Sequence, residues 1–553
     1  MTLFPLKFSP PLTTMYFQGE GSIDIPVQDI ISWIFDEERY DIDKPVYIDA
    51  SDTSRSISWR QARILVRQLA AGFKAAGLKD GDCVCLHSFN DIYYSILVLG
   101  IIAAGGIYMG TNPSYTSHEL GYHLRAAQVK FVISEPEMLD RMIPAAEGNG
   151  IPQDRIWAFT TRESQVPATT GLAPWTALLK HGEADWRRLN DPSQAKTTVV
   201  ARLFSSGTTG LPKPVDFTHY NLIAQHTLVY DAHPVPFEAR RILYLPFFHA
   251  AAAPSAHFSI LRLGDPSYVL RRFEPDLFLT TVDKQKITEC TAVPPIIHAI
   301  LAQSTTSKNS RSLQSLKVIR CGAAPLDKTT QARLQALLSL DATFTQVWGM
   351  TEASCIATMI PYPEPDDTGS VGRLLPGIEA KIIDSYGNDI TALDTTGEVC
   401  LRGPTIVRGY FNLPSANENA FDKDGFYRTG DLGYCDGKTR KWYLLDRKKD
   451  IIKVRGFQVA PAEVEGVLRN HPRIRDVAVV GVYNAEAKTE YPKAYVVRED
   501  QSLNEDEVKE YVAQRLAKYK RLDGGVRFVD AIPRNASGKI LKRLLEDTRE
   551  MKL

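Results

Sequence analysis

The chain has 553 residues, which is enough for more than one domain and for a large core. Hydrophobic residues make up 44% and charged residues 24%, an ordinary globular composition. The formal net charge is 0, so the charge balance argues against a nucleic acid or a strongly acidic partner. The seven cysteines are odd in number and scattered, which indicates free thiols in a reducing compartment.

The first part of the chain predicts alternating helices and strands, and hence an α/β layered architecture. Ser58 and Gln61 fit the capping box of a helix that Gly77 would end. Residues 84–86 and 131–133 are expected to form short strands.

An uncharged stretch from residue 92 to 109 is long enough to suggest a membrane helix. Gly100, Gly105 and Gly106 interrupt it, and no basic flank follows. We therefore predict a buried helix that runs into a buried strand, and no membrane span. The N-terminus lacks the basic start and apolar core of a signal peptide.

A stretch rich in Gly, Ser and Thr follows a predicted strand over residues 196–204. Glycines let backbone N–H groups turn toward an anion, hydroxyls add donors, and a lysine adds positive charge. This chemistry suits a polyphosphate, although the spacing is not that of a Walker A loop. An ordinary surface loop is the alternative. The candidates are Ser205, Ser206, Gly207, Thr208, Thr209, Gly210 and Lys213.

Further along, residues 244–249 are expected to form a strand that ends at His249, for which a structural role is the alternative. Residues 318–325 are expected to form a strand that breaks into a turn of small residues, where a flat ring could approach the backbone. A simple strand-to-helix turn is the alternative there.

Residues 346–352 and 427–431 combine aromatic, glycine, hydroxyl and carboxylate groups. Trp348 could pack on adenine, Thr351 could donate to a phosphate, and Glu352 could hold Mg²⁺. Asp431, at a turn shaped by glycine, could accept from two ribose hydroxyls, with an Asx-turn as the structural alternative.

A charge run at residues 446–450 marks a change in composition, and we place a domain boundary there. Residues 1–445 would form a large N-terminal domain and residues 451–553 a small C-terminal domain. From residue 446 onward the chain carries 23 Lys and Arg against 18 Asp and Glu, which suits a mobile lobe that approaches phosphates. Within it we expect helices from residue 461 and over 504–520, and strands at 477–482 and 494–497.

Near the end, Lys539 closes a loop rich in Gly, Ser and Asn, where a solvated lysine is the alternative. Taken in order, these motifs resemble those of the adenylate-forming superfamily over residues 203–539. That superfamily comprises acyl- and aryl-CoA synthetases, the adenylation domains of peptide synthetases, and firefly luciferase. The chain most resembles 4-coumarate–CoA ligases and related synthetases, and the run at residues 459–465 supports this.

The resemblance implies an α/β fold with a large N-terminal AMP-binding domain of several subdomains, built of layered sheets and helices, plus a small mobile α+β C-terminal domain. Residues 446–450 would be the hinge between the two domains. It also implies a two-step acid–thiol ligase reaction. A carboxylate attacks the α-phosphorus of Mg·ATP to give an acyl-adenylate and pyrophosphate, and CoA thiolate then displaces AMP to give a thioester. A carboxylate anion must meet a polyanion, so the site needs cations and fixed dipoles.

The resemblance also suggests individual roles. Lys539 would bridge the carboxylate and the α-phosphate, and the small domain would rotate about Lys449 between the steps. His249, Lys453 and Gln458 match positions linked to positioning or thioester formation. Residues 205–210 and Lys213 would hold the β- and γ-phosphates, Thr351 would bind the α-phosphate, and Glu352 would bind Mg²⁺. Adenine would lie against Ala323, Trp348 and Gly349, and the ribose would bind Asp431 and Arg447. CoA would bind Gly456 and Phe457, and the acid would lie against His249, Ala250, Arg320 and Gly322.

Two residues depart from the family pattern. Pro214 stands where glycine is usual, which removes an N–H group. Trp348 replaces the more usual tyrosine, which keeps a flat face and loses the phenol.

The expected substrate is an aryl or arylalkenoic acid, with a medium-chain fatty or polyketide-type acid as the alternative. Residues 246–253 contain no acid that could pair with an α-ammonium group, which disfavours amino acids. Alanines at 250–253 leave room, and Arg320 could meet a polar or anionic substituent.

Three other functions stay open. They are a stand-alone adenylation enzyme that loads a carrier protein in trans, a luciferase-like oxygenase, and a non-catalytic binding protein. The presence of Lys539, Glu352 and Asp431 argues against the last. The predicted location is the cytoplasm. The C-terminal Met551-Lys552-Leu553 resembles the peroxisomal Ser-Lys-Leu signal except in its first residue, so peroxisomal delivery is the alternative.

Overall fold

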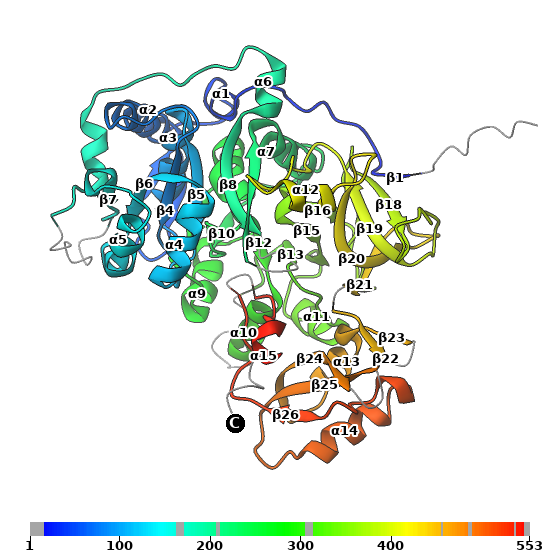
Figure 1. Cartoon of the computed structure of the whole chain (residues 1–553). Coiled ribbons are helices and arrows are strands. Elements are labelled where there is room, and N and C mark those ends of the chain that lie inside the picture. Colours follow the sequence, from blue (N-terminus) through cyan, green and yellow to red (C-terminus); the bar gives the residue numbers. More distant parts are fainter. Residues whose placement is uncertain are drawn as a thin grey trace, which may run out of the picture.

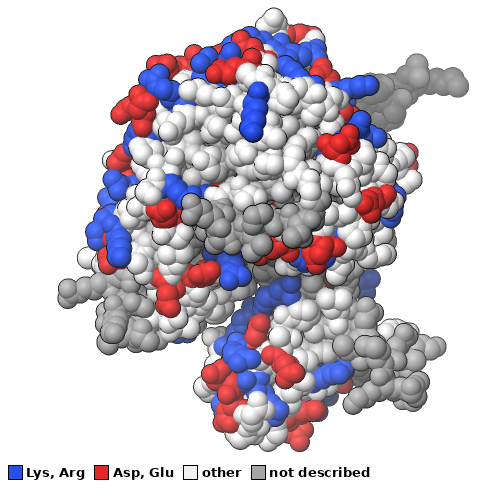
Figure 2. All heavy atoms as spheres, turned by 90° about the vertical axis from the view of Figure 1, so that its left-hand side faces the viewer, with Lys and Arg blue, Asp and Glu red and all other residues white. Residues whose placement is uncertain are grey.

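The computed structural model describes residues 16–161, 171–205, 211–304, 313–448, 450–454, 457–484, 489–535 and 538–546. A large N-terminal body carries a small C-terminal body at one end (Figure 1). In the space-filling view, positive and negative side chains are interspersed on the visible face, and a narrow waist separates the two bodies (Figure 2).

The first sheet of the large body has the strand order β7-β6-β4-β5-β8-β9. Its strands run parallel except for the antiparallel pair β8 and β9. Every residue of β4 and β5 is buried, as expected for parallel strands covered on both faces. The strands predicted at 84–86 and 131–133 are confirmed. The bounds are β4 (Cys83–His87), β5 (Ile107–Thr111), β6 (Val129–Ser134), β7 (Ile156–Ala158), β8 (Val199–Ser205) and β9 (Lys213–Thr218).

Helix α2 (Trp59–Ala75) begins at the predicted capping box, in which the side chains of Ser58 and Gln61 each accept from the other's backbone N–H. Gly77 follows its end with a φ of 86°, which favours glycine. The apolar stretch after it forms α3 (Tyr94–Ala103), buried at every residue, and leads into β5. Among the described residues, no helix is long and apolar enough to cross a membrane.

The second sheet of the large body has the order β14-β13-β12-β10-β11-β2-β3. The predicted strand at 244–249 is wrong in its position. β10 ends at Leu243, where its ladder with β11 ends opposite Val269. Pro246 has no N–H group with which to extend such a ladder. The bounds are β2 (Pro45–Asp49), β3 (Ser56–Ser58), β10 (Arg241–Leu243), β11 (Ser267–Val269), β12 (Glu289–Ala292), β13 (Val318–Cys321) and β14 (Thr343–Gln346).

Large apolar side chains fill the space between these two sheets. One cluster joins α1, α2 and α3 to residues that follow β10, and it contains Trp33, Phe73, Tyr94, Phe247 and Phe258, each at most 1% exposed. The other helices of the large body are α1 (Ile30–Phe35), α4 (Ser117–Ala126), α5 (Leu139–Glu147), α6 (Pro192–Thr197), α7 (His219–His226), α8 (Ile260–Leu263), α9 (Pro275–Gln285), α10 (Pro294–Ser304), α11 (Lys328–Gln335) and α12 (Pro414–Ala420).

An antiparallel sheet, β1-β18-β19-β20-β21, and a smaller one, β15-β16-β17, complete the large body. The last strand, β21, leads toward the small body, so this sheet carries the predicted hinge region. The bounds are β1 (Phe17–Gln18), β15 (Trp348–Met350), β16 (Cys355–Met359), β17 (Arg373–Leu374), β18 (Glu379–Ile383), β19 (Gly397–Arg402), β20 (Tyr427–Cys435) and β21 (Trp442–Arg447).

The small body contains a hairpin, a mixed sheet and helices, the α+β pattern that the sequence predicts. The predicted helix over 504–520 is wrong in extent, because α14 ends at Ala513 and a short 3₁₀ turn, Lys518–Lys520, follows separately. Lys449, the predicted pivot, lies outside the described residues. The bounds are β22 (Ile452–Val454), β23 (Phe457–Val459), β24 (Ile474–Asn484), β25 (Thr489–Arg498), β26 (Val526–Phe528), α13 (Pro461–Arg469), α14 (Glu505–Ala513) and α15 (Lys542–Glu546).

Candidate active site

A cavity of about 460 Å³ lies where the two bodies meet. Most of its walls come from the large body, and the small body adds Asn535 and Lys539. Many predicted site residues line it, although they are far apart in the sequence. They are Ser205, Lys213, His249, Ala250, Gly322, Ala323, Gly349, Thr351, Glu352, Arg447 and Lys539.

The other predicted residues include some that the structure does not describe. Ser206, Gly207, Thr208, Thr209, Gly210, Lys449 and Gly456 are outside the described residues, and so are the side-chain atoms of Gln458. Lys453 and Phe457 belong to the β22–β23 hairpin, where Lys453 pairs with Gln458 in register. Phe457 is 55% exposed, and neither side chain lines the cavity.

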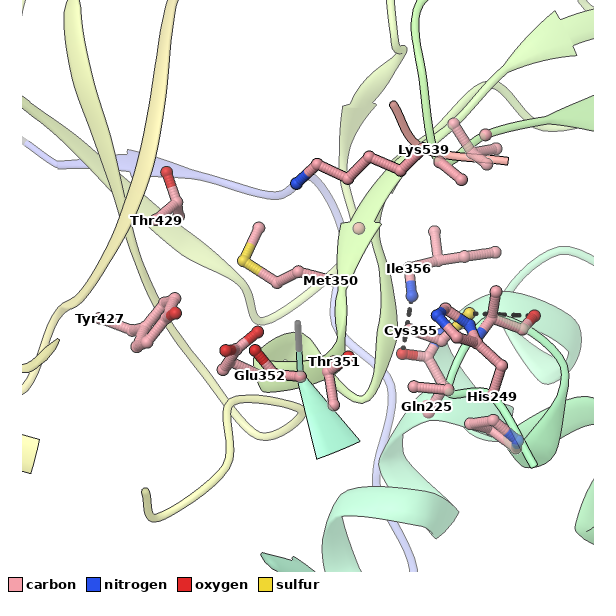
Figure 3. Close-up of a pocket in the computed structure, with 18 of the residues that line it drawn as sticks. Gln225, His249, Met350, Thr351, Glu352, Cys355, Ile356, Tyr427, Thr429 and Lys539 are labelled. Carbon is pink, nitrogen blue, oxygen red and sulfur yellow. Dashed lines mark hydrogen bonds between the residues drawn. The ribbon is translucent and has the colours of Figure 1, made fainter. Parts of the chain in front are cut away.

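Lys539 extends across the cavity from the small body. In Figure 3 its ammonium group lies above Met350 and points toward Thr429. It is between the part of the cavity that contains His249 and the part that contains Glu352. The loop that carries it packs on the start of α10, because a Cβ atom on Gly538 would lie 3.1 Å from the ring of Pro295. Gly538 has a φ of 82°. The glycine before the lysine therefore permits both the turn and the close approach.

Glu352 is held on the other side of the cavity by a tyrosine that the sequence analysis missed. The hydroxyl of Tyr410 donates to Oε1 of Glu352 at 2.8 Å. The Nζ atom of Lys213 lies 4.8 Å from the centre of the same tyrosine ring. Burial, and then the Glu352 carboxylate, raise the pKa of Tyr410 far above its ordinary value, so the hydroxyl keeps its proton. Tyr410 follows an Arg-Gly pair in a loop, a pattern with no chemical signal of its own.

Trp348 was predicted to lie against adenine, and the structure gives its indole a different neighbour. The side chain is 5% exposed, does not line the cavity, and donates from Nε1 to Oδ2 of Asp431 at 2.8 Å. On the other side, Nε of Arg447 lies 2.5 Å from Oδ1 of the same carboxylate. Burial lowers the pKa of the Arg447 guanidinium, but the carboxylates of Asp431 and Glu352 raise it by more, so the pKa lies above its ordinary value. Asp431 is thus fixed behind the cavity wall that Arg447 lines.

Glycine at 349 has a packing reason. A Cβ atom there would lie 1.6 Å from the backbone oxygen of Cys355 on the adjacent strand β16, a distance that no side chain could tolerate.

Pro214 is accommodated in β9 opposite Phe204, and its carbonyl accepts from the N–H of Phe411.

The end of the cavity near His249 is mainly apolar. Nδ1 of His249 accepts from the N–H of Ala251 at 3.1 Å, which requires a neutral ring with its proton on Nε2. Burial lowers the pKa of His249 to about 4. Nearby, Oε1 of Gln225 accepts from the N–H of Ile356 at 3.2 Å (Figure 3). Val229, Leu245, Ala250, Ala251, Pro254 and Val293 add apolar surface.

Arg320 was predicted at the edge of the substrate pocket. It is 6% exposed, within β13, and does not line the cavity itself. It lines a smaller pocket, which shares Tyr230, Leu245, Ala251, Ser255 and Thr291 with the cavity. Its Nη1 lies 3.5 Å from Glu289 on the neighbouring strand β12, and that carboxylate also binds Arg241. A buried cation next to a buried carboxylate is a structural pairing.

Comparison with known proteins identifies the class. Residues 36–411 match the family described as "AMP-binding enzyme", and residues 463–539 match "AMP-binding enzyme C-terminal domain". The chain therefore belongs to the AMP-binding enzymes, the adenylate-forming superfamily that its motifs predict.

Individual relatives cover nearly all of the chain. It is 88% identical over 539 residues to the phenylacetyl-CoA ligase epaB of Aspergillus niger, covering 98% of this chain and 100% of the relative. It is also 88% identical over 531 residues to the acyl-CoA ligase azaF of Aspergillus niger, covering 96% of this chain and 100% of the relative. The chain is therefore an acid–thiol ligase that acts through an acyl-adenylate. Among solved structures, ATP-bound MatB from Rhodopseudomonas palustris is 26% identical with a TM-score of 0.82, covering 95% of this chain and 99% of MatB.

Proposed function

We propose that this chain activates an arylacetic acid, phenylacetate foremost, with ATP and transfers the acyl group to CoA. The observation that carries the proposal is the 88% identity, over 98% of the chain, to a relative named phenylacetyl-CoA ligase. The apolar end of the cavity suits a phenyl ring, since its walls are largely small or aliphatic. This substrate belongs to the aryl class that the sequence predicts.

The charges around the cavity support an uncharged acyl tail. The carboxylates among the described lining residues are Glu352 and Glu398. Tyr410 binds the first, and Lys448 binds the second at 2.8 Å. Neither lies beside the apolar end, so an α-ammonium group there would be buried without a partner, at a high cost.

In the first step, a carboxylate oxygen of the acid forms a bond to the α-phosphorus and the bond to pyrophosphate breaks. Lys539 spans the cavity between the apolar end and the side of Glu352, where its charge would attract both anions. Thr351 and Lys213 would bind phosphate oxygens. The carboxylate of Glu352 fits Mg²⁺, which proteins bind with one or two carboxylates plus substrate phosphates, and which would neutralise the polyphosphate when bound.

In the second step, the thiolate of CoA attacks the acyl carbonyl and AMP leaves. Lys453 and Phe457 are our candidates to guide CoA, yet their hairpin lies away from the cavity in this orientation of the small body. We therefore include in the proposal a rotation of residues 451–553 about Lys449, which would exchange Lys539 for this hairpin.

A medium-chain acyl acid is the second candidate, since the relative azaF, equally similar, is named only an acyl-CoA ligase. ATP–pyrophosphate exchange with phenylacetate, a cinnamate, octanoate and phenylalanine, repeated with CoA and followed by mass spectrometry, tests both. Exchange and a thioester with phenylacetate are expected. A thioester only with octanoate would support the second candidate, and exchange without a thioester would indicate a carrier protein as acceptor.

A further inference from the structure

Tyr410 lies between two groups of opposite charge at the end of the cavity where we place the phosphates of ATP. Its hydroxyl donates to Oε1 of Glu352 at 2.8 Å, and its ring faces Nζ of Lys213 at 4.8 Å. All three residues line the cavity. The side chain of Tyr410 is therefore in contact with both a candidate ligand of Mg²⁺ and a candidate cation for the phosphates.

The hydrogen bonds around Tyr410 have a defined direction. A tyrosine hydroxyl has one proton, and that of Tyr410 goes to Glu352. The hydroxyl of Tyr427, 3.2 Å away, must then donate to the oxygen of Tyr410. Within the described part of the chain, Oε2 of Glu352 receives no hydrogen bond, so it is the oxygen available to a metal ion.

The backbone of Tyr410 is fixed on both sides. The side-chain amide of Asn417, in α12, accepts from the N–H of Tyr410 at 2.7 Å and donates to its carbonyl at 2.9 Å. The opposite side is bonded to the edge of β9, where the N–H of Phe411 donates to the carbonyl of Pro214 at 2.9 Å. Lys213 begins that same strand. The hydrogen bond between Phe411 and Pro214 therefore fixes the backbone of Tyr410 next to the backbone of Lys213.

We propose that Tyr410 is a positioning residue that sets Glu352 and Lys213 at a fixed separation for a Mg·polyphosphate. The hydroxyl orients the carboxylate of Glu352 for the metal, and the ring face holds the ammonium group of Lys213. The ring leaves the positive charge of that ammonium group available, whereas a neighbouring carboxylate would neutralise it. The inference rests on the proposed function, because it assumes that ATP binds in this cavity.

The test separates the two contacts by calorimetric titration of the full-length enzyme with ATP, without an acid and at increasing Mg²⁺. Tyr410→Phe removes the hydroxyl and keeps the ring. We expect the Mg²⁺ concentration that gives half of the gain in ATP affinity to rise roughly tenfold, because losing a hydrogen bond to a charged group costs about that factor in affinity. The affinity for metal-free ATP should stay within about twofold of the wild-type value. Tyr410→Leu removes the ring as well, and should also weaken metal-free ATP.

Two variants serve as comparisons. Tyr427→Phe removes only the donor to Tyr410 and should change the Mg²⁺ requirement in the same direction, by less. Tyr443→Phe removes a tyrosine hydroxyl that donates to Thr368 outside the cavity and should change nothing.

The outcomes distinguish the inference from the function on which it rests. A wild-type enzyme that does not bind ATP would overturn the proposed function. If the wild-type enzyme binds ATP and responds to Mg²⁺, and Tyr410→Phe has the same Mg²⁺ requirement, the positioning role is wrong and the proposed function stands. Equal weakening of metal-free and metal-bound ATP in Tyr410→Phe would indicate a structural role only, and would also overturn the inference.

Discussion

At the scale of single residues, Gly538 decides whether Lys539 reaches the cavity. Gly538→Ala would strain a backbone at a φ of 82° and place a methyl group 3.1 Å from Pro295. We expect adenylate formation to fall by about ten- to a hundredfold, measured by pyrophosphate exchange, because the loop must move away from α10. Thioester formation from supplied acyl-adenylate should change little.

Gly525→Ala is the matched control. Gly525 has a φ of 98°, but a Cβ atom there would meet nothing within 4 Å. It therefore carries the same kind of backbone penalty without the contact to the large body. Equal losses of exchange activity in the two variants would show that the packing on Pro295 is unimportant.

His249 gives a prediction about pH. Burial lowers its pKa from the ordinary 6.5 to about 4, so the unfolded chain takes up a proton before the folded protein does. The stability that the neutral ring provides is thus complete above pH 6.5 and is lost as the pH falls toward 4. Relative to His249→Gln, the wild-type protein should lose about 2 kcal/mol of unfolding free energy between pH 7.5 and 5, measured by urea denaturation at each pH.

The comparison with His249→Gln cancels the titration of every other group. A difference in stability that does not vary with pH would contradict the depressed pKa. It would also contradict the neutral ring that the hydrogen bond from Ala251 requires.

Single residues also show how far the sequence can be interpreted. Lys539, Glu352 and Thr351 were predicted because their charge or hydroxyl chemistry stands in recognisable motifs, and all of them line the cavity. Tyr410 was missed, since its importance depends on Asn417 and β9, which only the folded chain brings to it. The ion pair of Arg320 was not predicted, because its partner, Glu289, lies on a neighbouring strand that no local pattern identifies.

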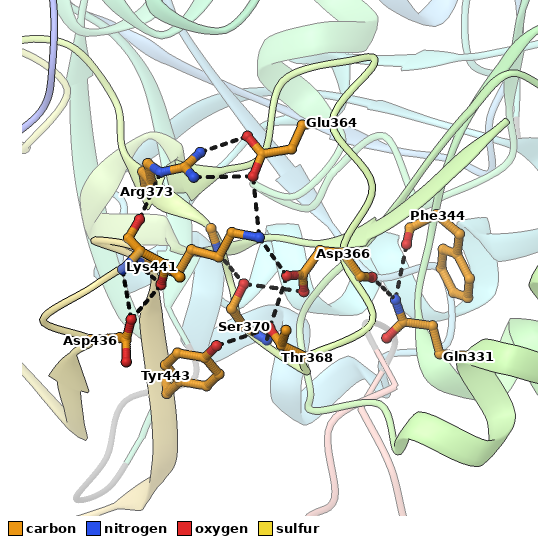
Figure 4. A network of polar contacts seen from close by, with 12 residues as sticks. Gln331, Phe344, Glu364, Asp366, Thr368, Ser370, Arg373, Asp436, Lys441 and Tyr443 are labelled. Carbon is orange, nitrogen blue, oxygen red and sulfur yellow. Dashed lines mark hydrogen bonds and ion pairs between the residues drawn. The ribbon is translucent and has the colours of Figure 1, made fainter. Parts of the chain in front are cut away.

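At the scale of elements, a partly buried ion-pair network joins the β20–β21 hairpin to the loop before β17 (Figure 4). Nζ of Lys441 lies 2.8 Å from Asp366 and 3.2 Å from Glu364, and Asp366 also accepts from Ser370. Lys441→Met would leave the buried Asp366 carboxylate without its cation. We expect a loss of about 3–5 kcal/mol in unfolding free energy, measured by urea denaturation.

Lys438→Met, an exposed lysine in the turn of the same hairpin, should cost less than about 0.5 kcal/mol. Adding Asp366→Asn to Lys441→Met should recover part of the loss, because the uncompensated charge is removed. Similar stabilities for the two lysine variants would mean that the network does not hold the hairpin.

Elements with a local signal were predicted well, and those defined by pairing were not. The capping box of α2 and the buried helix α3 are confirmed, since periodicity and hydrogen-bonding side chains lie within the segment. The strand predicted at 244–249 failed because β10 ends where its neighbour β11 ends, at Val269, a limit that the sequence of β10 does not contain.

At the scale of the whole molecule, a helix cap crosses the predicted hinge. Oδ2 of Asp446, the first residue of the predicted hinge, accepts from the N–H of Ala462 at 3.0 Å, in the first turn of α13 in the small body. This contact depends on the present orientation of the bodies. Asp446→Ala should therefore slow adenylate formation severalfold, measured by pyrophosphate exchange, and should leave thioester formation from supplied acyl-adenylate unchanged or faster.

Asn504→Ala is the control, since Asn504 caps α14 wholly within the small body, where its Oδ1 accepts from the backbone N–H of Glu507 at 3.0 Å. It removes a cap of similar strength without affecting the orientation of the bodies. If both variants slow exchange equally, the cap of α13 stabilises the small body rather than its placement.

The two reaction steps should be separable by two lysines of the small body, of which only Lys539 lines the cavity. Lys539→Ala should abolish adenylate formation and spare thioester formation from supplied acyl-adenylate, because only the first step uses the face that this structure turns to the cavity. Lys453→Ala, on the β22–β23 hairpin away from the cavity, should do the reverse. Rapid-quench assays of each half-reaction measure both. Rotation makes the losses reciprocal, since one small body cannot present both faces at once, whereas a fixed arrangement would make either variant impair both steps.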